Sequence, residues 1–124
     1  MYSPTELTLD RLRKAGWTAE VVERWVPAPH LTGGGFRRDF LGCIDIVAVR
    51  RGETLAVQCT SASGHSARVK KVCKEPRMYA WLSAGNRLEV WSWDQEAPRC
   101  RWRERVEEIT ADRLVAPEFH LEAG

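Results

Sequence analysis

The chain is built around one segment, which reads Asp39-Phe-Leu-Gly-Cys-Ile-Asp45-Ile-Val-Ala-Val-Arg50-Arg-Gly-Glu-Thr-Leu-Ala-Val-Gln58-Cys-Thr60. It holds two apolar runs rich in β-branched residues, 44–49 and 54–57, with Arg51-Gly52 between them. Glycine adopts the positive φ that a tight turn requires, and a dipeptide ending in glycine between two such runs is a strong hairpin signal. The segment therefore predicts a β-hairpin with polar residues inside it.

The turn also sets the register of the two strands. With Arg51-Gly52 as the loop, Val47 lies opposite Ala56 and Asp45 lies opposite Gln58. Side chains alternate between the two faces of a strand. One face is therefore predicted to hold Cys43, Asp45, Gln58 and Thr60, and the other Ile44, Ile46, Val57 and Cys59.

Asp45 is an acidic residue among apolar neighbours. A carboxylate buried without a partner is costly, so Asp45 needs a hydrogen bond, a metal ion or water. Two interpretations follow. Either Asp45 and Gln58 form a hydrogen bond across the hairpin inside a satisfied core, or Asp45 is a ligand in a metal site.

These features resemble the PD-(D/E)XK nuclease superfamily, especially archaeal-type Holliday-junction resolvases and related phage nucleases. The family pattern is an Asp, a hairpin and then Glu-x-Lys. Here Asp45 stands in Ile44-Asp45-Ile46-Val47-Ala48, and Gln58-Cys59-Thr60-Ser61 stands where Glu-x-Lys-Ser would. In layout the resemblance covers about Ser3 to Trp93. It implies an α/β protein with a restriction-endonuclease-like αβββαβ core, in which helices flank a central mixed sheet, and the chain adds a C-terminal strand.

The resemblance implies a Mg²⁺- or Mn²⁺-dependent endonuclease that cuts a phosphodiester of nucleic acid, with DNA as the expected substrate, by means of a metal-activated water. Its catalytic positions here are Asp45, Gln58 and Thr60, and its metal ligands are Asp45, Gln58 and Glu6. Junction resolvases of this type act as symmetric dimers, so a homodimer is also implied. The alternatives are a catalytically inactive nuclease-fold protein that binds nucleic acid or a protein partner, and an unrelated α/β binding module.

Two of the three core motif positions depart from the family pattern. Gln58 offers Mg²⁺ a carbonyl oxygen without a charge, and Thr60 offers no ammonium group. An active enzyme must take this positive charge from elsewhere, and the segment 65–74 is the nearest source. Because Val69, Val72 and Cys73 have helical spacing, they are expected to face the core. The predicted replacement is Lys71, followed by His65 and Lys70.

The start of the chain predicts a helix over about residues 4–15. Ser3-Pro4-Thr5-Glu6 is a capping box with proline in the first turn, and Gly16 ends the pattern. Glu6 has two possible roles. Its carboxylate caps the Ser3 amide, or, as the resemblance implies, it reaches the metal.

Between this helix and the hairpin, residues 17–26 predict the first strand, and the Pro- and Gly-rich segment 27–35 predicts a loop, which is either a plain linker or a flap that closes on the substrate. Arg37 and Arg38 follow it as candidate nucleic-acid contacts. Asp39 has the same strand parity as Asp45. A straight strand would separate the two by roughly 20 Å, so Asp39 is left out of the metal site unless the chain bends.

The second half of the chain predicts helices over 65–74 and 76–84, broken at Glu75-Pro76, and a fourth strand over 87–93. Residues 99–106 then alternate as an edge strand, with arginines on one face. These arginines either protect the edge and pair with Glu89 or Glu104, or contact phosphates while the tryptophans stack on bases. The candidate nucleic-acid contacts of this half are Arg68, Arg99, Arg101 and Arg103. Little order is expected after residue 109.

The composition is that of one globular domain, which we expect to span residues 1–124. The 19 Lys and Arg residues against 17 Asp and Glu give a net charge of +2, so binding of nucleic acid requires a local basic patch. The polar N-terminus lacks a secretory signal, and no apolar run approaches the roughly 20 residues of a membrane span. We therefore expect a cytoplasmic protein without a membrane partner. Its four cysteines lack CxxC spacing and are expected to be buried thiols.

Overall fold

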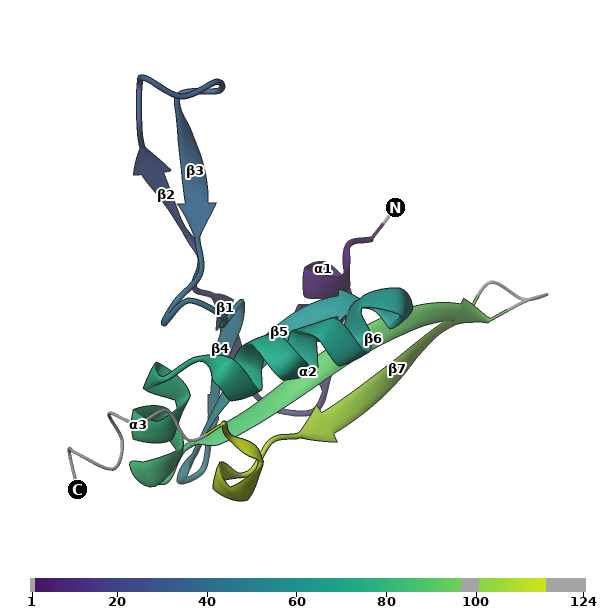
Figure 1. Ribbon diagram of the computed structural model, residues 1–124. Coiled ribbons are helices and arrows are strands. Elements are labelled where there is room, and N and C mark those ends of the chain that lie inside the picture. The colour runs from purple at the N-terminus through teal and green to yellow at the C-terminus, as the bar shows by residue number, and fades with distance from the viewer. Residues whose placement is uncertain (1, 97–100, 116–124) are drawn as a thin grey trace.

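The computed structural model describes residues 2–96 and 101–115 (Figure 1). Its main feature is a five-stranded mixed sheet in the order β1-β4-β5-β6-β7. Neighbouring strands pair antiparallel except β5 and β6, which are parallel. The strands are β1 (Thr18–Val21), β4 (Ile46–Arg50), β5 (Glu53–Ser61), β6 (Arg87–Glu96) and β7 (Arg101–Glu108). With helices on both faces, the predicted α/β class with a central mixed sheet is confirmed.

The helices begin and end close to the predicted residues. Helix α1 (Pro4–Lys14) has the predicted capping box, in which the Ser3 hydroxyl accepts from the Glu6 amide and the Glu6 carboxylate accepts from the Ser3 amide. Helices α2 (His65–Lys74) and α3 (Arg77–Ser83) are separated at Pro76, where the ring is incompatible with continuing α2. Short 3₁₀ turns, Ala62–Gly64 and Ala111–Arg113, precede α2 and follow β7. No helix among the described residues is long and apolar enough to cross a membrane.

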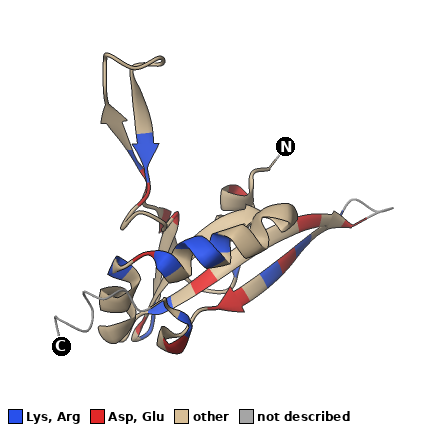
Figure 2. Cartoon of the chain, viewed as in Figure 1, with Lys and Arg blue, Asp and Glu red and all other residues tan. Residues whose placement is uncertain are grey.

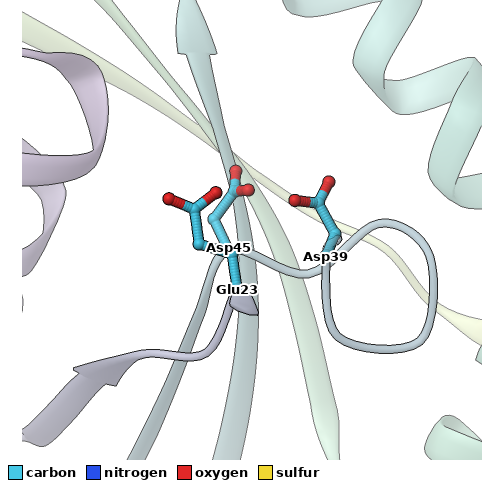
Figure 3. Close-up of side chains that lie close together, drawn as sticks. All are labelled: Glu23, Asp39 and Asp45. Carbon is cyan, nitrogen blue, oxygen red and sulfur yellow. The ribbon is translucent and has the colours of Figure 1, made fainter. Parts of the chain in front are cut away.

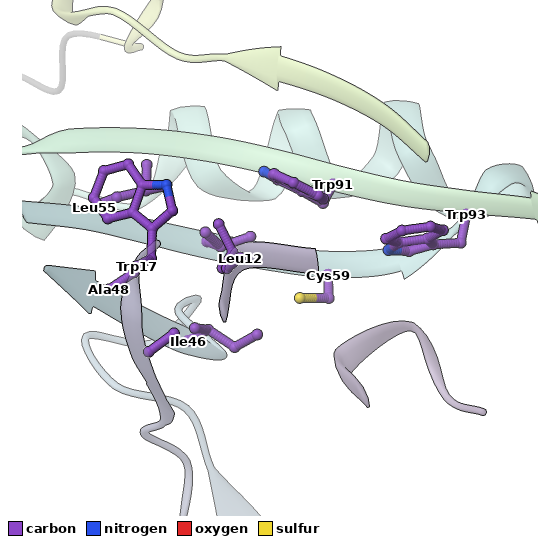
Figure 4. Close-up of a cluster of buried hydrophobic side chains, with 10 residues drawn as sticks. Leu12, Trp17, Ile46, Ala48, Leu55, Cys59, Trp91 and Trp93 are labelled. Atoms are coloured by element: carbon purple, nitrogen blue, oxygen red, sulfur yellow. The ribbon is translucent and has the colours of Figure 1, made fainter. Parts of the chain in front are cut away.

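The sheet separates two apolar cores. On the α1 face, Leu12 packs with Val57, Cys59 and the indoles of Trp91 and Trp93 (Figure 4). On the α2 and α3 face, the buried residues include Ala56, Val72, Met78, Leu88 and Val90. The fourth strand predicted over residues 87–93 is therefore confirmed as part of β6, with Leu88 and Val90 in one core and Trp91 and Trp93 in the other. Strand β6 continues beyond its predicted end because Glu96 still pairs with Arg101 of β7.

The predicted hairpin register is confirmed, since Val47 pairs with Ala56 and Arg50 with Glu53. The predicted alternation is wrong for Ile44 but holds for Cys43, which lies in the core opposite to that of Val57 and Cys59. Strand β4 begins only at Ile46, and residues 40–43 form a turn in which Leu41 and Gly42 have positive φ. Ile44 and Cys43 therefore pack on the α2 face, in the second core. Cys43, Cys59 and Cys73 are buried free thiols as expected, and Cys100 lies outside the described residues.

The region predicted as one strand and a loop folds differently. Residues 17–26 divide into β1 and β2 (Arg24–Pro27), and β2 pairs antiparallel with β3 (Gly35–Arg38). These two strands form a separate two-stranded sheet that stands away from the rest of the molecule (Figure 1). We call residues 24–38 the arm. Its tip contains the Pro- and Gly-rich segment that was predicted to be a loop.

Candidate functional site

Three carboxylates meet where the arm joins the main sheet. Glu23, Asp39 and Asp45 each contribute one oxygen to a group whose atoms all lie within 4.8 Å of one another. Figure 3 shows the three side chains side by side, pointing in the same direction. We call these three residues the acidic cluster. Oxygen ligands from carboxylates are those preferred by Mg²⁺, Mn²⁺ and Ca²⁺, so the cluster has the chemistry of a hard-cation site.

The fold explains why residues distant in sequence converge here. Arg24 pairs with Arg38 at the foot of the arm. Glu23 comes directly before β2 and Asp39 directly after β3, so both lie next to this pair, where the arm joins the main sheet. The turn at 40–43 then reverses the chain, so that Phe40 bridges to Ile44 and Asp39 approaches Asp45. The chain therefore bends between Asp39 and Asp45, which is the condition under which Asp39 was expected to join the site, and the separation calculated for a straight strand does not apply.

Asp45 is anchored to the start of β5. Its Oδ2 accepts hydrogen bonds from the Cys59 amide at 2.9 Å and from Gln58 Nε2 at 2.5 Å, so the predicted contact between Asp45 and Gln58 is confirmed. The core around this pair is not fully satisfied, however. Gln58 is only 1% exposed, and its Oε1 has no hydrogen-bond partner among the described residues. Buried polar atoms normally have a partner, and this carbonyl oxygen belongs to the amide group that contacts Asp45.

The environment of Asp45 opposes its ionisation. Its pKa is raised from the ordinary 3.8 to about 6, chiefly because burial penalises the charged form. The negative charges of Asp39 and Glu23 raise this pKa further, whereas the Cys59 amide and the charge of Arg68 lower it. Three crowded carboxylates of this kind bind either a proton or a cation more readily than an isolated carboxylate does.

Positive side chains lie around the acidic cluster. Lys71 of α2 places Nζ 3.6 Å from Asp39 Oδ2, and Arg37 of the arm places Nη1 2.6 Å from Glu23 Oε1. The structure thus brings to the cluster the lysine that sequence reasoning preferred, together with Arg68, whose charge is felt at Asp45. Lys70, the next residue on α2, is exposed.

Two other predicted catalytic residues have mainly structural surroundings. Thr60 is buried, and a Cβ on Gly64 would collide with its hydroxyl, so no room is left there for a longer side chain without movement. His65 is 2% exposed and uses both ring nitrogens, Nδ1 with the Ser92 hydroxyl at 2.7 Å and Nε2 with Glu107 at 2.8 Å. These contacts place His65 in a network between α2, β6 and β7, not in the acidic cluster.

The remaining predicted residues are not brought to the cluster. Glu6 is held by the capping box at the start of α1. Arg101 and Arg103 are exposed on β7, and Arg99 lies outside the described residues. The tryptophans of this region do not offer base-stacking surfaces, since Trp91 and Trp93 are buried and Trp102 packs against the α1-side core. Of the two alternatives for this strand, base stacking by Trp91 and Trp93 is therefore disfavoured, because β6 is an inner strand of the sheet with α1 packed against it.

Sequence reasoning missed Glu23. A signal for it exists in the mirrored order Glu23-Arg24 and Arg38-Asp39 on either side of the Gly-rich segment. If 24–38 is interpreted as a hairpin, these four residues must meet at its foot.

Comparison with family models, curated proteins and solved structures finds no match to this chain. The functional argument therefore depends on the residues and their geometry.

Proposed function

We propose that the protein is a divalent-metal-dependent nuclease whose acidic cluster holds Mg²⁺ or Mn²⁺. The observation that carries the proposal is the convergence of Glu23, Asp39 and Asp45 on one small volume with Lys71 beside it. Structural ion pairs alone do not explain this arrangement. Lys71 and Arg37 pair with Asp39 and Glu23, which leaves the carboxylate of Asp45 without an ion pair among the described residues. The raised pKa of Asp45 reflects burial first and then the negative charges of its two neighbours.

The donor set fits a hard cation. All three cluster residues offer carboxylate oxygens, and a divalent cation stabilises carboxylates that are crowded in this way. The amide of Gln58 donates through Nε2 to Asp45, and its buried Oε1 has no hydrogen-bond partner among the described residues. In the proposal, Gln58 remains the neutral residue that would complete the site. When bound, the metal supplies an activated water and polarises a phosphoryl oxygen.

Two residues, Asp45 and Lys71, would carry the roles that the metal does not supply. Asp45 is fixed by the Cys59 amide at the foot of the arm, where its carboxylate belongs to the cluster. The ammonium of Lys71, which lies 3.6 Å from Asp39, is placed to stabilise negative charge that develops on a phosphate held at the cluster. Lys71 therefore takes over the role that the resemblance assigns to a lysine at position 60.

The arrangement of elements supports a restriction-endonuclease-like fold. The main sheet and its helices follow the order α1, β1, β4, β5, α2 and α3, β6, with β7 as the extra C-terminal strand. This is the predicted α-β-β-β-α-β order with the arm inserted after the first strand. The position of Asp45 directly before β4 and of Gln58 within β5 also agrees with the motif.

A catalytically inactive relative that binds nucleic acid is the second candidate. It is favoured by the neutral Gln58 and by the buried Thr60, which stand at positions charged in the family pattern. The two candidates differ in what a metal does. An enzyme needs the cation for cleavage, whereas an inactive relative binds its partner with or without it.

The test combines metal binding with cleavage. Calorimetric titration of Mn²⁺ into the wild type is expected to show a site that weakens in Asp39→Asn and in Glu23→Gln. Cleavage of labelled DNA and RNA oligonucleotides is expected only when Mg²⁺ or Mn²⁺ is present. Metal binding without cleavage of any oligonucleotide would favour the inactive relative, and absence of metal binding would refute the proposed site.

A further inference from the structure

A basic pocket adjoins the acidic cluster on the side of the arm. It encloses about 260 Å³ and is lined by three arginines, Arg24, Arg38 and Arg77, together with Asp39 and apolar atoms of Leu41 and Phe40. Asp39 belongs to both the pocket and the cluster. A group bound in the pocket therefore lies directly beside the proposed metal site.

Two of these arginines carry uncompensated charge. Arg24 and Arg38 are direct cross-strand partners in the arm, and neither forms an ion pair with any residue in the described part of the chain. Like charges directly opposite each other destabilise a strand pair. An anion between the two guanidinium groups would remove that repulsion, and phosphate accepts the forked hydrogen bonds that arginine donates.

The third arginine of the pocket, Arg77, is held in place by an ion pair with Glu75. Arg77 donates to both carboxylate oxygens of Glu75, at 2.8 and 3.1 Å, and this ion pair packs against Gly42 in the turn between Asp39 and Asp45. A Cβ at Gly42 would collide with both Arg77 and Glu75. The wall of the pocket is thus a fixed part of the turn that assembles the cluster.

The arm extends the basic pocket with an exposed aromatic ring. Cross-strand partners share a face and side chains alternate, so Phe36, two residues before Arg38, lies on the same face as Arg24 and Arg38. Its side chain is 46% exposed. On the opposite face, the indole of Trp25 lies against Gly35, where a Cβ would be only 2.6 Å away. Only the first face combines free arginines with an aromatic surface.

Residues 24–38 contain three arginines and no acidic residue, and Figure 2 shows basic residues at the foot of β3 next to the acidic residues of the cluster. We propose that this face of the arm binds an unpaired nucleic-acid strand, with a backbone phosphate in the basic pocket and a base stacked on Phe36. The proposal rests on the proposed nuclease function, and it names the substrate class. An unpaired strand is required because the face of a base is accessible to an aromatic side chain only outside the duplex stack.

The geometry gives the strand a direction relative to the cluster. Phe36 and Arg38 are two positions apart on an extended strand, which corresponds to about 6.7 Å, and Asp39 is the next residue after Arg38. The stacked base, the pocket phosphate and the proposed metal site then lie in that order along β3, from the middle of the arm to its foot. The arm thus leads the unpaired strand into the acidic cluster.

The experiment measures binding without cleavage. Fluorescence anisotropy of a labelled single-stranded oligonucleotide is recorded in EDTA at several salt concentrations, with single-stranded DNA, single-stranded RNA and duplex DNA as separate arms. For the double variant Arg24→Gln/Arg38→Gln we expect at least tenfold weaker binding of single strands. The slope of log K against log salt should fall in magnitude by about 0.7 for each phosphate that the variant no longer neutralises. Phe36→Ala should weaken binding roughly tenfold.

Matched variants keep the proposal falsifiable. Trp25→Ala removes a larger aromatic from the opposite face, and Arg101→Gln/Arg103→Gln removes the same charge from β7, so both are expected to change binding less than threefold. Circular dichroism checks that each variant is folded. Equal losses of affinity in Phe36→Ala and Trp25→Ala, or stronger binding of duplex than of single strands by the wild type, would overturn the proposal. A change in the oligomeric mass of Phe36→Ala with unaltered oligonucleotide binding would overturn it in favour of a contact between two copies.

The failure of this inference is distinguishable from that of the proposed function. Hydrolysis of bis(p-nitrophenyl) phosphate by the wild type with Mn²⁺ reports the metal centre without any extended strand. Hydrolysis together with arm variants that bind like the wild type contradicts only the arm proposal. Absence of hydrolysis together with arm-dependent binding contradicts only the nuclease.

Discussion

The arm and strand β7 both present arginines to solvent, yet their surroundings differ. In the arm, three arginines occur without an acidic residue. In β7, three arginines alternate with glutamates, visible as alternating blue and red segments in Figure 2. Arg103 lies 3.9 Å from Glu96, Arg105 lies 3.6 Å from Glu107, and Glu104 pairs instead with Arg11 of α1. The number of arginines is the same, but the charge that remains for a phosphate is not.

The difference in remaining positive charge is what we expect between a surface that binds phosphate, the arm, and a strand whose edge is protected from further pairing, β7. Counterion release on binding of nucleic acid requires basic groups whose charge is not already neutralised. Among the described strands, β7 is the outer one of the sheet and pairs with β6 alone, and its charged side chains hinder pairing with a further strand. The arm has the positive charge, the exposed aromatic and the neighbouring carboxylates in one place. The predictions that compare the arm with β7 can therefore be ordered by the size of the expected effect.

The largest effect is expected at the foot of the arm. Asp45→Asn should lower Mg²⁺-dependent cleavage at least a thousandfold, because Asn keeps the shape of the side chain and removes a charge that a hard cation requires. Asp39→Asn should lower it by roughly a hundredfold or more. The matched change near β7 is Glu96→Gln, which removes one acidic charge beside Arg103 and should leave cleavage unchanged. Initial rates on a labelled oligonucleotide measure all three, and near-normal activity of Asp45→Asn with a native circular dichroism spectrum would refute the metal site.

The next effect concerns the lysine beside the cluster. Lys71→Ala should lower kcat roughly a hundredfold with little change in oligonucleotide binding, because its ammonium acts on charge that develops during the reaction. Lys74→Ala, in the same last turn of α2 and exposed, is the control. Adding Thr60→Lys to Lys71→Ala should restore little activity, because Thr60 is buried against Gly64 and a lysine there fits only if this turn moves. Full activity of Lys71→Ala alone would exclude Lys71.

A smaller effect is expected in the pH dependence of stability. The pKa of Asp45 in the folded protein, about 6, lies above its ordinary value of 3.8. The folded state therefore binds this proton more tightly, and the resulting stability is full below about pH 3.8 and is lost as pH rises through about 6. In EDTA at pH 8, Asp45→Asn should be more stable than the wild type by about 1–3 kcal/mol, measured by urea unfolding. Saturating Mn²⁺ should reverse this order, whereas equal stability of the two proteins at pH 8 in EDTA would contradict the unfavourable burial of this charge in the cluster.

Most of the main sheet could be predicted from the sequence because its signals are local. Arg51-Gly52 sets the hairpin register, the capping box sets the start of α1, and Pro76 separates α2 from α3. The arm could not be predicted in this way. Its strands are only four residues each and are joined by prolines and glycines, so they show no periodicity.

The site was predictable only in part for the same physical reason. The Asp45–Gln58 contact follows from hairpin register, and Lys71 follows from the helical pattern of α2. The convergence of the other two carboxylates, Glu23 and Asp39, depends on a turn and on pairing within the arm. Leu41 is a non-glycine residue at a φ of 50°, a conformation that its residue type does not indicate, and this turn is what brings Asp39 back to Asp45.

The smallest effect is expected for the arginines of β7. Sequence alternation alone predicts that replacing Arg101 and Arg103 weakens binding of nucleic acid and lowers its salt dependence. In the structure these side chains are exposed among glutamates, and exposed ion pairs of this kind contribute little energy while cancelling local charge. We therefore expect Arg101→Gln/Arg103→Gln to change oligonucleotide affinity less than threefold at about 0.15 M salt and to leave the salt slope within error of the wild type. The same anisotropy titration measures the variants of the arm and of β7. If Arg101→Gln/Arg103→Gln lowered the affinity and the salt slope as much as Arg24→Gln/Arg38→Gln does, β7 would also contact phosphates, and the distinction between the arm and β7 would be lost.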